Sequence, residues 1–512
     1  MSNEPTETDS EVREAPTTTL GILRNVGPGM ILAGSIVGSG ELIATTRTGA
    51  EAHFDFLWLI IIGCIIKVFA QIELGRYAIT SGKTTLAALN EVPGPRIANA
   101  NWILLYWFFM FLAILGQQGG IVGGVGQAMA ISVPLTEEGK TYNEYVAKKV
   151  NLDVKKAELV NLPPGTSERI SMEKVVTALS SELQKAGEVP KAKDDVYWSL
   201  VLTLVAILLL VWGKFSFIER FSVFLVATFT LITIANLFAL QSYDKWAVTA
   251  EEFRRGLSFG FPDSEGGANP LVTALAAFGI IGVGAAELLA YPYWCLEKGY
   301  GKYVGKRDES DAWAHRAKGW MKVMHWDAWG AMVVYTFCTI AFYLLGAAVL
   351  GRSNLLPEGS EMIQTLSAMY QPVFGGFAQN LFLFGAFAVL FSTFYVAIAA
   401  QGRLAVDVVK VSGVADLDEP ARQRGLKWMG VVLPTLSVLC YVFFPKPVVL
   451  VLIAGTMQAI MLPLIGFAVL YFRYKHCDKR LQPNKLWDLF LWLSFAGFLV
   501  VGGYQTYAKL FQ

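Results

Sequence analysis

Eleven apolar segments, each long enough to cross a lipid bilayer, constrain the fold of this chain more than any other feature. They lie near residues 20–50, 54–79, 97–133, 196–212, 221–240, 271–297, 327–350, 374–409, 426–444, 448–472 and 486–510. Only 16% of the 512 residues are charged, whereas soluble domains carry about 25%. We therefore predict an all-α membrane protein with eleven spans.

One short sequence occurs twice, mid-way along the first and the sixth span. Residues 36–44 read IVGSGELIA and residues 282–290 read GVGAAELLA, with glutamates at Glu41 and Glu287. Small residues allow a helix to break, and irregular backbone at this depth persists only where it lines a cavity. Two such breaks at corresponding positions are typical of transporters built from inverted repeats.

The two breaks suggest a division of the chain into two repeats. We assign residues 1–19 to a disordered tail, 20–243 to a first repeat with spans 1–5, 271–473 to a second repeat with spans 6–10, and 486–510 to span 11. A charged insert, residues 135–195, interrupts the first repeat. Its Val175, Val176, Leu179 and Leu183 recur at helical spacing and predict an amphipathic helix.

Basic residues in the short loops indicate the orientation in the membrane. Those on the side of the N-terminus are Lys83, Arg96, Lys214, Arg220, Lys298, Lys302, Lys306, Arg307, Arg473, Lys475, Lys479 and Arg480. Because such residues stay in the cytoplasm, we predict a cytoplasmic N-terminus and an extracytoplasmic insert. The expected location is the plasma (inner) membrane, as an integral multi-pass protein.

The composition also argues against several classes of function. The formal net charge of +1 gives no indication of a nucleic-acid partner. The five cysteines lie mostly inside apolar segments, which predicts neither a disulfide framework nor a metal site of the CxxC type. We see no nucleophile–base pair and no phosphate-binding loop, so we expect no enzymatic activity and no cofactor. The oligomeric state is left open, and a monomer would suffice.

Two intramembrane carboxylates are the strongest functional signal. Together with backbone carbonyls freed at the breaks, Glu41 and Glu287 would suit a hard divalent cation such as Mg²⁺ or Mn²⁺. The candidate ligands are Glu41, Glu287, the carbonyls near Gly38 and Ala285, and Gln458, Gln401 and Ser392 acting through waters. The alternative is that Lys67 or Arg47 neutralises these glutamates, which would weaken divalent binding.

Several motifs together resemble the Nramp family of divalent-metal transporters. They are Gly27-Pro28-Gly29, the run from Arg76 to Gly82-Lys83, Ser392-Thr393 followed by Gln401, and Gln458 near Pro463. The resemblance implies a LeuT-type fold of two inverted five-helix repeats plus an eleventh span. It also implies that a metal ion is held between broken helices 1 and 6. The expected partners are therefore this ion, as substrate, and the lipid bilayer.

The chain departs from the pattern of that family at the metal site. The Asp-Pro-Gly-Asn motif falls on Gly38, Ser39, Gly40 and Glu41, and the Met-Pro-His motif falls on Ala286, Glu287 and Leu288. Positions that carry protons in the family fall near Gln117 and Gly120, which cannot titrate. In these departures the chain resembles the magnesium-type branch, which implies passive transport of Mg²⁺ or Mn²⁺ by alternating access without proton coupling.

Two other functions remain open at this point. The glycine-rich break at residues 36–40 is similar to that of amino-acid/polyamine/organocation transporters, which implies an amino acid or an amine as substrate, with Lys67 in place of a coupling cation. The third hypothesis is a receptor or scaffold whose insert, residues 135–195, binds a partner.

Overall fold

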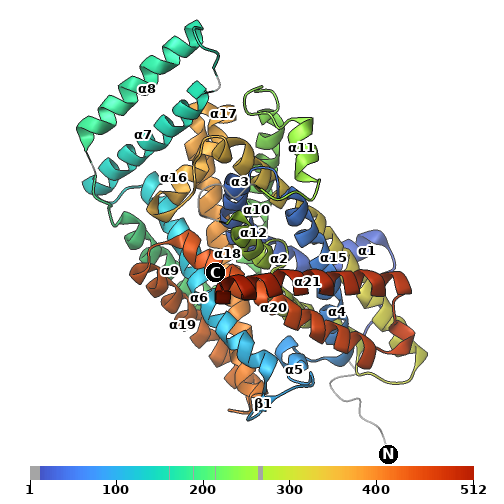
Figure 1. The fold of residues 1–512 in the computed structure, drawn as a ribbon. Helices are drawn as coiled ribbons and strands as arrows, with labels where there is room; N and C mark the ends of the chain where they lie inside the picture. Colours follow the sequence, from blue (N-terminus) through green and yellow to red (C-terminus); the bar gives the residue numbers. More distant parts are fainter. Residues whose placement is uncertain (1–11, 161, 188, 214, 263–268, 512) are drawn as a thin grey trace, which may run out of the picture.

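The computed structural model describes residues 12–160, 162–187, 189–213, 215–262 and 269–511. It is a bundle of long helices, with one two-stranded antiparallel ribbon formed by β1 (Arg96–Ile97) and β2 (Ala100–Asn101) in the described part (Figure 1). By length and composition, ten helical stretches of the described chain could span a membrane, and Phe224–Leu240 is a shorter apolar helix. These correspond to the eleven predicted spans.

The first five spans contain the following helices. They are α1 (Thr19–Asn25), α2 (Pro28–Ile36), η2 (Ser39–Thr45), α3 (Thr46–Ala52), α4 (Leu57–Ser81), α5 (Thr85–Leu89), α6 (Trp102–Ser132), α9 (Asp194–Trp212) and α10 (Phe215–Leu240). The connection to the sixth span contains α11 (Ala250–Gly256). The first span is broken between α2 and η2, as the small residues there predict.

The remaining six spans follow in the same way. The elements are α12 (Pro270–Ile280), α13 (Ala285–Glu297), α14 (Tyr300–Val304), α15 (Asp311–Leu345), η3 (Gly346–Gly351), η4 (Gly359–Glu361), α16 (Met362–Ser367), η5 (Ala368–Tyr370), α17 (Gln371–Phe374), η6 (Gly375–Phe377), α18 (Ala378–Val411), α19 (Glu419–Phe443), α20 (Pro447–Lys475), η7 (Lys479–Leu481) and α21 (Lys485–Phe511). The sixth span is broken between α12 and α13.

Helix α6 lies at the centre of the bundle and packs against α9, α18, α19 and α20. Its glycines allow this close packing. A Cβ atom at Gly119 would lie 2.4 Å from the Ser437 carbonyl oxygen, and one at Gly120 would lie 2.6 Å from that of Pro447. The glycine-rich sequence of the third span is therefore explained by helix contact, the usual role of small residues between membrane helices.

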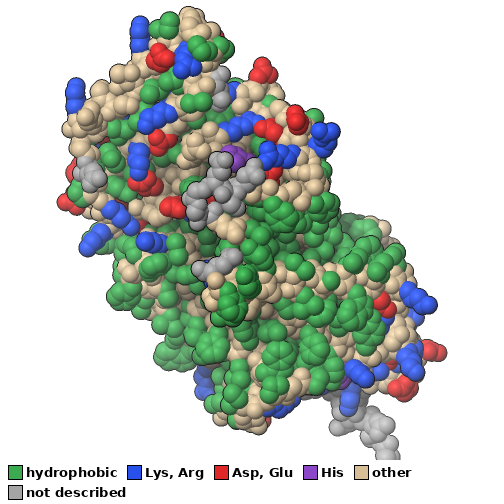
Figure 2. Space-filling model, viewed as in Figure 1, with side chains coloured by type: hydrophobic (Ala, Val, Ile, Leu, Met, Phe, Trp, Pro, Cys, Tyr) green, Lys and Arg blue, Asp and Glu red, His purple; other side chains and the backbone are tan. Residues whose placement is uncertain are grey.

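A broad apolar surface covers the middle of the face that Figure 2 shows. Charged side chains gather at its two ends, over the insert helices and near the N-terminus. Large apolar side chains on the outer helices are exposed, among them Leu204, Phe238 and Val500. Exposed apolar surface of this extent is expected of a protein that has lipid as its solvent.

The insert forms two helices, α7 (Glu137–Val160) and α8 (Ser167–Ala186), which project from one end of the bundle (Figure 1). Helix α8 contains the predicted amphipathic stretch, but none of its residues is buried. Helix α7 is fixed to the bundle because Asp194 accepts hydrogen bonds from the backbone N–H groups of Leu135 and Thr136, at 2.6 and 3.0 Å.

Two segments differ from the sequence prediction. Residues 12–18, assigned to a disordered tail, lie against α14 and α15, where Arg13 N donates to the Tyr303 carbonyl at 3.1 Å. Residues 1–11 and Lys214 lie outside the described residues. The helix that contains the seventh span, α15, begins at Asp311, ahead of the span predicted near residues 327–350, because Ser310 caps it by accepting from Trp313 N at 3.1 Å.

Candidate metal-transport site

At the break in the first span, residues of two other helices, α12 and α18, lie unusually close to the backbone. A Cβ atom at Gly38 would lie 2.2 Å from Thr393 Oγ1, and one at Gly40 would lie 2.8 Å from the Ile280 carbonyl oxygen. Real Cβ atoms do not approach other atoms so closely, so these two positions require glycine. The small residues of the motif therefore let α18 and α12 pack directly on the broken backbone.

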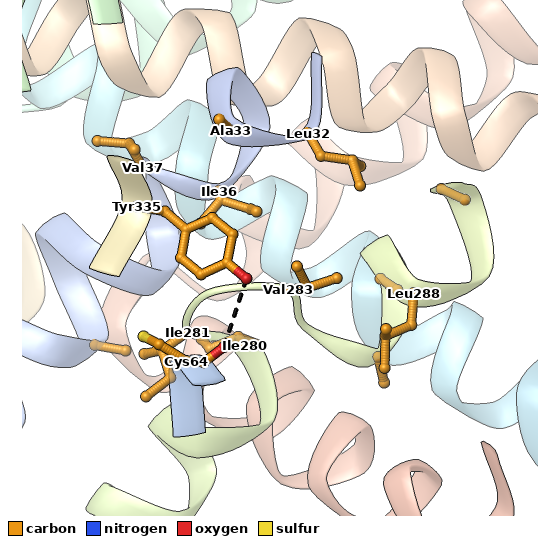
Figure 3. Packing of buried hydrophobic residues seen from close by; sticks show 14 of the residues in the cluster. Leu32, Ala33, Ile36, Val37, Cys64, Ile280, Ile281, Val283, Leu288 and Tyr335 are labelled. Carbon is orange, nitrogen blue, oxygen red and sulfur yellow. Dashed lines mark hydrogen bonds between the residues drawn. The ribbon is translucent and has the colours of Figure 1, made fainter. Parts of the chain in front are cut away.

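The break in the sixth span is an unwound turn, residues 281–284, between α12 and α13. Gly282 has φ +54°, a left-handed conformation that glycine adopts without strain. Figure 3 shows Ile281 and Val283 on this turn, with the Tyr335 ring beside it and the Tyr335 hydroxyl directed at the Cys64 carbonyl, 3.5 Å away. The turn exposes backbone N–H and C=O groups that a continuous helix would use internally.

Glu41 lies against the unwound turn and is fully buried. Its Oε1 atom accepts hydrogen bonds from the Gly282 backbone N–H at 3.0 Å and from Thr339 Oγ1 at 3.1 Å. Its Oε2 atom is buried without a hydrogen-bond partner among the described residues. Glu41 thus joins the two broken spans, and it does not line the cavity that Glu287 faces.

Neither predicted counter-charge forms an ion pair with the site glutamates within the described residues. Lys67 is fully buried, and its Nζ donates to the carbonyls of Phe278 and Ile281, the latter at 2.7 Å. Arg47 instead pairs with Glu51 at 2.6 Å and with Glu358 at 2.8 Å.

Glu287, on the first turn of α13, faces a narrow cavity from the other end of the unwound turn. Gln117, Gln118, Gln401 and Trp294 also line this cavity, with apolar residues of α2, α6 and α18 between them. Its free volume is ≈ 10 Å³, about the space of one water molecule. Three buried oxygens in this lining, Glu287 Oε2, Gln118 Oε1 and Gln401 Oε1, have no hydrogen-bond partner in the described part of the chain.

A chain of amides connects the two breaks. Gln458 accepts a hydrogen bond from Ala286 N at 3.0 Å and donates to Gln117 Oε1 at 2.8 Å. Gln117 in turn donates to Ser39 Oγ at 2.9 Å. Since its amide is engaged at both ends, Gln458 orients the site and holds the breaks at a fixed separation.

The other predicted ligands, Ser392, Gly38 and Ala285, do not line this cavity. Ser392 Oγ donates to the Gly34 carbonyl at 3.4 Å, so this hydroxyl is used in a hydrogen bond between α18 and α2. The Gly38 carbonyl accepts from Leu42 N at 3.1 Å, and Ala285 is the buried first residue of α13. Their role as ligands stays a prediction.

Gln118 is the cavity residue that the sequence analysis missed. Its signal was available, because two consecutive glutamines in the middle of an apolar span are costly unless they meet a partner or a ligand. Hydrophobicity alone could not show which of these two glutamines has an unpartnered oxygen in the cavity lining.

The sequence matches the model of the Nramp family, described as natural resistance-associated macrophage protein-like, over residues 188–508. This chain belongs to the Nramp family. Members of this family are transporters. No match was found among curated proteins.

Solved structures show the same fold in this Nramp protein and in distant transporters. A glutamate-to-glutamine mutant of the manganese transporter from Eremococcus coleocola superposes with a TM-score of 0.61 and 14% identity, covering 99% of this chain and 93% of that one. The same transporter with an aromatic bis-isothiourea substituted compound gives 0.59 and 14%, over 98% and 91%. MhsT in complex with L-phenylalanine gives 0.52 and 16%, over 96% and 99%. The predicted fold class is confirmed.

Proposed function

We propose that this Nramp protein carries a hard divalent cation, Mg²⁺ or Mn²⁺, across the membrane by alternating access. The observation that carries the proposal is the group of unpartnered oxygens around the cavity: Glu287 Oε2, Gln118 Oε1 and Gln401 Oε1. Oxygen-only donor sets suit Mg²⁺ and Mn²⁺, whereas softer transition metals favour sulfur or imidazole. The fold of a manganese transporter supports the same substrate class.

In this proposal Glu287 and Glu41 are the charged ligands. They approach the same unwound turn, Glu41 at Gly282 and Glu287 at Gly284, and each keeps one oxygen without a partner in the described structure. Gln118 and Gln401 supply neutral oxygens, and waters complete the shell, since Mg²⁺ keeps several of its waters when bound. Such an incomplete protein shell favours release as well as binding.

We further propose that transport is passive and resembles the magnesium-type branch. Within the described residues, Glu287 is the one titratable carboxylate lining the cavity, and amides occupy positions 117 and 118. The membrane potential is a sufficient driving force. Moving one charge through 100 mV is worth about 2.3 kcal/mol, so a divalent ion gains roughly 4.6 kcal/mol, more than a thousandfold in accumulation.

The test is ion influx into proteoliposomes under an imposed inside-negative potential. We expect Mg²⁺ and Mn²⁺ influx that is insensitive to a pH gradient and is reduced at least tenfold by Glu287→Gln and by Glu41→Gln. Glu173→Gln is the matched control, since this glutamate is exposed and belongs to α8, which projects from one end of the bundle (Figure 1). Flux that persists in both site variants would refute the proposal, and amino-acid uptake independent of divalent ions would favour the alternative substrate class.

A further inference from the structure

A second cavity lies at the end of the bundle that carries the N-terminus. Its volume is ≈ 680 Å³, within the range of small-molecule sites. Four cationic side chains line it, Arg13, Lys298, Lys302 and Arg422, against two carboxylates, Glu297 and Glu419. These residues come from three separate parts of the chain: the N-terminal segment, the end of α13 with α14, and the start of α19.

The two carboxylates are already engaged. Glu297 accepts hydrogen bonds from Arg403 at 2.8 Å and from Arg422 at 3.3 Å. Glu419 pairs with the same Arg422 at 3.4 Å. Both carboxylates of the lining thus pair with arginines, whereas Arg13 and Lys298 form no ion pair within 4 Å among the described residues.

Arg13 is held in place by its backbone rather than by a carboxylate. Its N–H donates to the Tyr303 carbonyl at 3.1 Å, and its carbonyl accepts from Trp320 Nε1 at 3.0 Å. Its guanidinium carbon lies 3.5 Å from the centre of the Tyr303 ring. The guanidinium is thus positioned on an aromatic face.

We propose that this cavity binds a phosphate-bearing anion. Positive side chains that are gathered around one space repel one another unless an anion lies between them. A guanidinium on a rigid support presents a planar set of donors that matches phosphate geometry, and lysines add point charges. An anion bound here would connect the N-terminal segment, α13–α14 and α19. The proposal is independent of which ion the protein transports.

Two sources share this chemistry, a soluble phosphate compound and the headgroup of an anionic lipid. For the first, full-length protein in detergent and metal-free buffer with EDTA is titrated with tripolyphosphate by isothermal calorimetry. For the second, thermal unfolding is compared in nanodiscs of phosphatidylcholine with and without phosphatidylglycerol. The test variant is Arg13→Gln/Lys298→Gln/Lys302→Gln, whose positions are exposed, so folding is expected to be retained.

We expect either binding of tripolyphosphate in the calorimeter or a higher unfolding temperature with phosphatidylglycerol, and either effect should be weaker at high salt. In the triple variant the dissociation constant rises at least tenfold, or the shift in unfolding temperature is lost. Lys318→Gln, an exposed lysine of α15 outside the cavity lining, should retain wild-type behaviour. Binding in the tripolyphosphate arm assigns a soluble ligand, and an effect confined to phosphatidylglycerol assigns a lipid. No binding in either arm, or equal binding by the triple variant, would overturn the proposal.

Discussion

Lys67 Nζ donates to the Ile281 carbonyl oxygen at 2.7 Å, so the buried ammonium lies at the C-terminal end of α12. The end of a helix carries partial negative charge from its free carbonyls, and a cation there is stabilised. This contact fixes the first residue of the unwound turn whose next N–H holds Glu41. Lys67 therefore positions the break in the sixth span instead of neutralising a glutamate directly.

Replacing Lys67 by methionine should reduce divalent influx at least tenfold. The change leaves two buried carbonyls without their donor, and each charged hydrogen bond is worth about 1.5–3 kcal/mol, so the turn loses its fixed conformation. Influx into proteoliposomes measures the effect, with Lys174→Met on exposed α8 as control. Wild-type influx in a monodisperse Lys67→Met protein would contradict the positioning role.

Gln118→Leu should impair transport without lowering the stability of the protein. Because Gln118 Oε1 has no partner among the described residues, its loss removes no hydrogen bond there, and the unfolding temperature should stay the same or rise. The KM for Mg²⁺ should rise about tenfold if this oxygen contacts the ion.

Gln458→Leu is the contrasting variant, since it breaks the bonds to Ala286 and Gln117 and should lower the unfolding temperature. Equal stability losses in both variants would assign Gln118 a structural role.

Asp327→Asn should destabilise the N-terminal end of the first span by about 1–3 kcal/mol. The two carboxylate oxygens accept from the backbone N–H groups of Gly27 and Gly29 at 2.9 and 2.5 Å, at the start of α2. An amide retains one acceptor and loses the charge. Thermal unfolding in detergent measures the difference, and Asp416→Asn, whose side chain is 94% exposed, should have no effect.

Gly38→Ala should abolish transport and lower stability severely. The added Cβ would lie 2.2 Å from Thr393 Oγ1, so α18 would have to move away from the break. The matched control is Gly330→Ala in α15, where a Cβ meets no atom within 4 Å and where alanine favours the helix by about 0.5–1 kcal/mol. Normal influx in Gly38→Ala would show that this close contact is absent in the working protein.

The loop between α20 and α21 should give a pH-dependent contribution to stability. The hydrogen bond from Arg480 is the largest cause that lowers the pKa of Asp478 from 3.8 to about 2, with Arg307 also contributing. Because the folded-state pKa lies below that of the unfolded chain, the stabilisation is complete above about pH 5 and is lost as the pH falls toward 2.

The difference between the unfolding temperatures of wild-type protein and Asp478→Asn should therefore be full at pH 7 and should narrow as the pH is lowered from 5 to 3. A difference that stays constant over this range would exclude the carboxylate as its source.

Much of the fold could be predicted because hydrophobicity acts locally. A run of apolar residues becomes a span wherever it packs, and glycines next to a glutamate at mid-membrane indicate a break. The eleven spans and the two breaks follow from residues such as Gly38, Glu41, Gly282 and Glu287. The start of α15, ahead of the apolar span, could not be predicted in this way because its first turns are polar and their helix depends on capping and packing.

The composition of each span, read from the sequence, thus determined which helices exist and placed two carboxylates at the depth of the breaks. Only the tertiary structure decided that Lys67 contacts carbonyls rather than a glutamate, that Gln118 offers a free oxygen beside Glu287, and that Arg13 lies on Tyr303. Such contacts depend on how each helix is rotated about its axis and on its distance from neighbours. Packing of the whole bundle sets these quantities, and no local run of residues contains them.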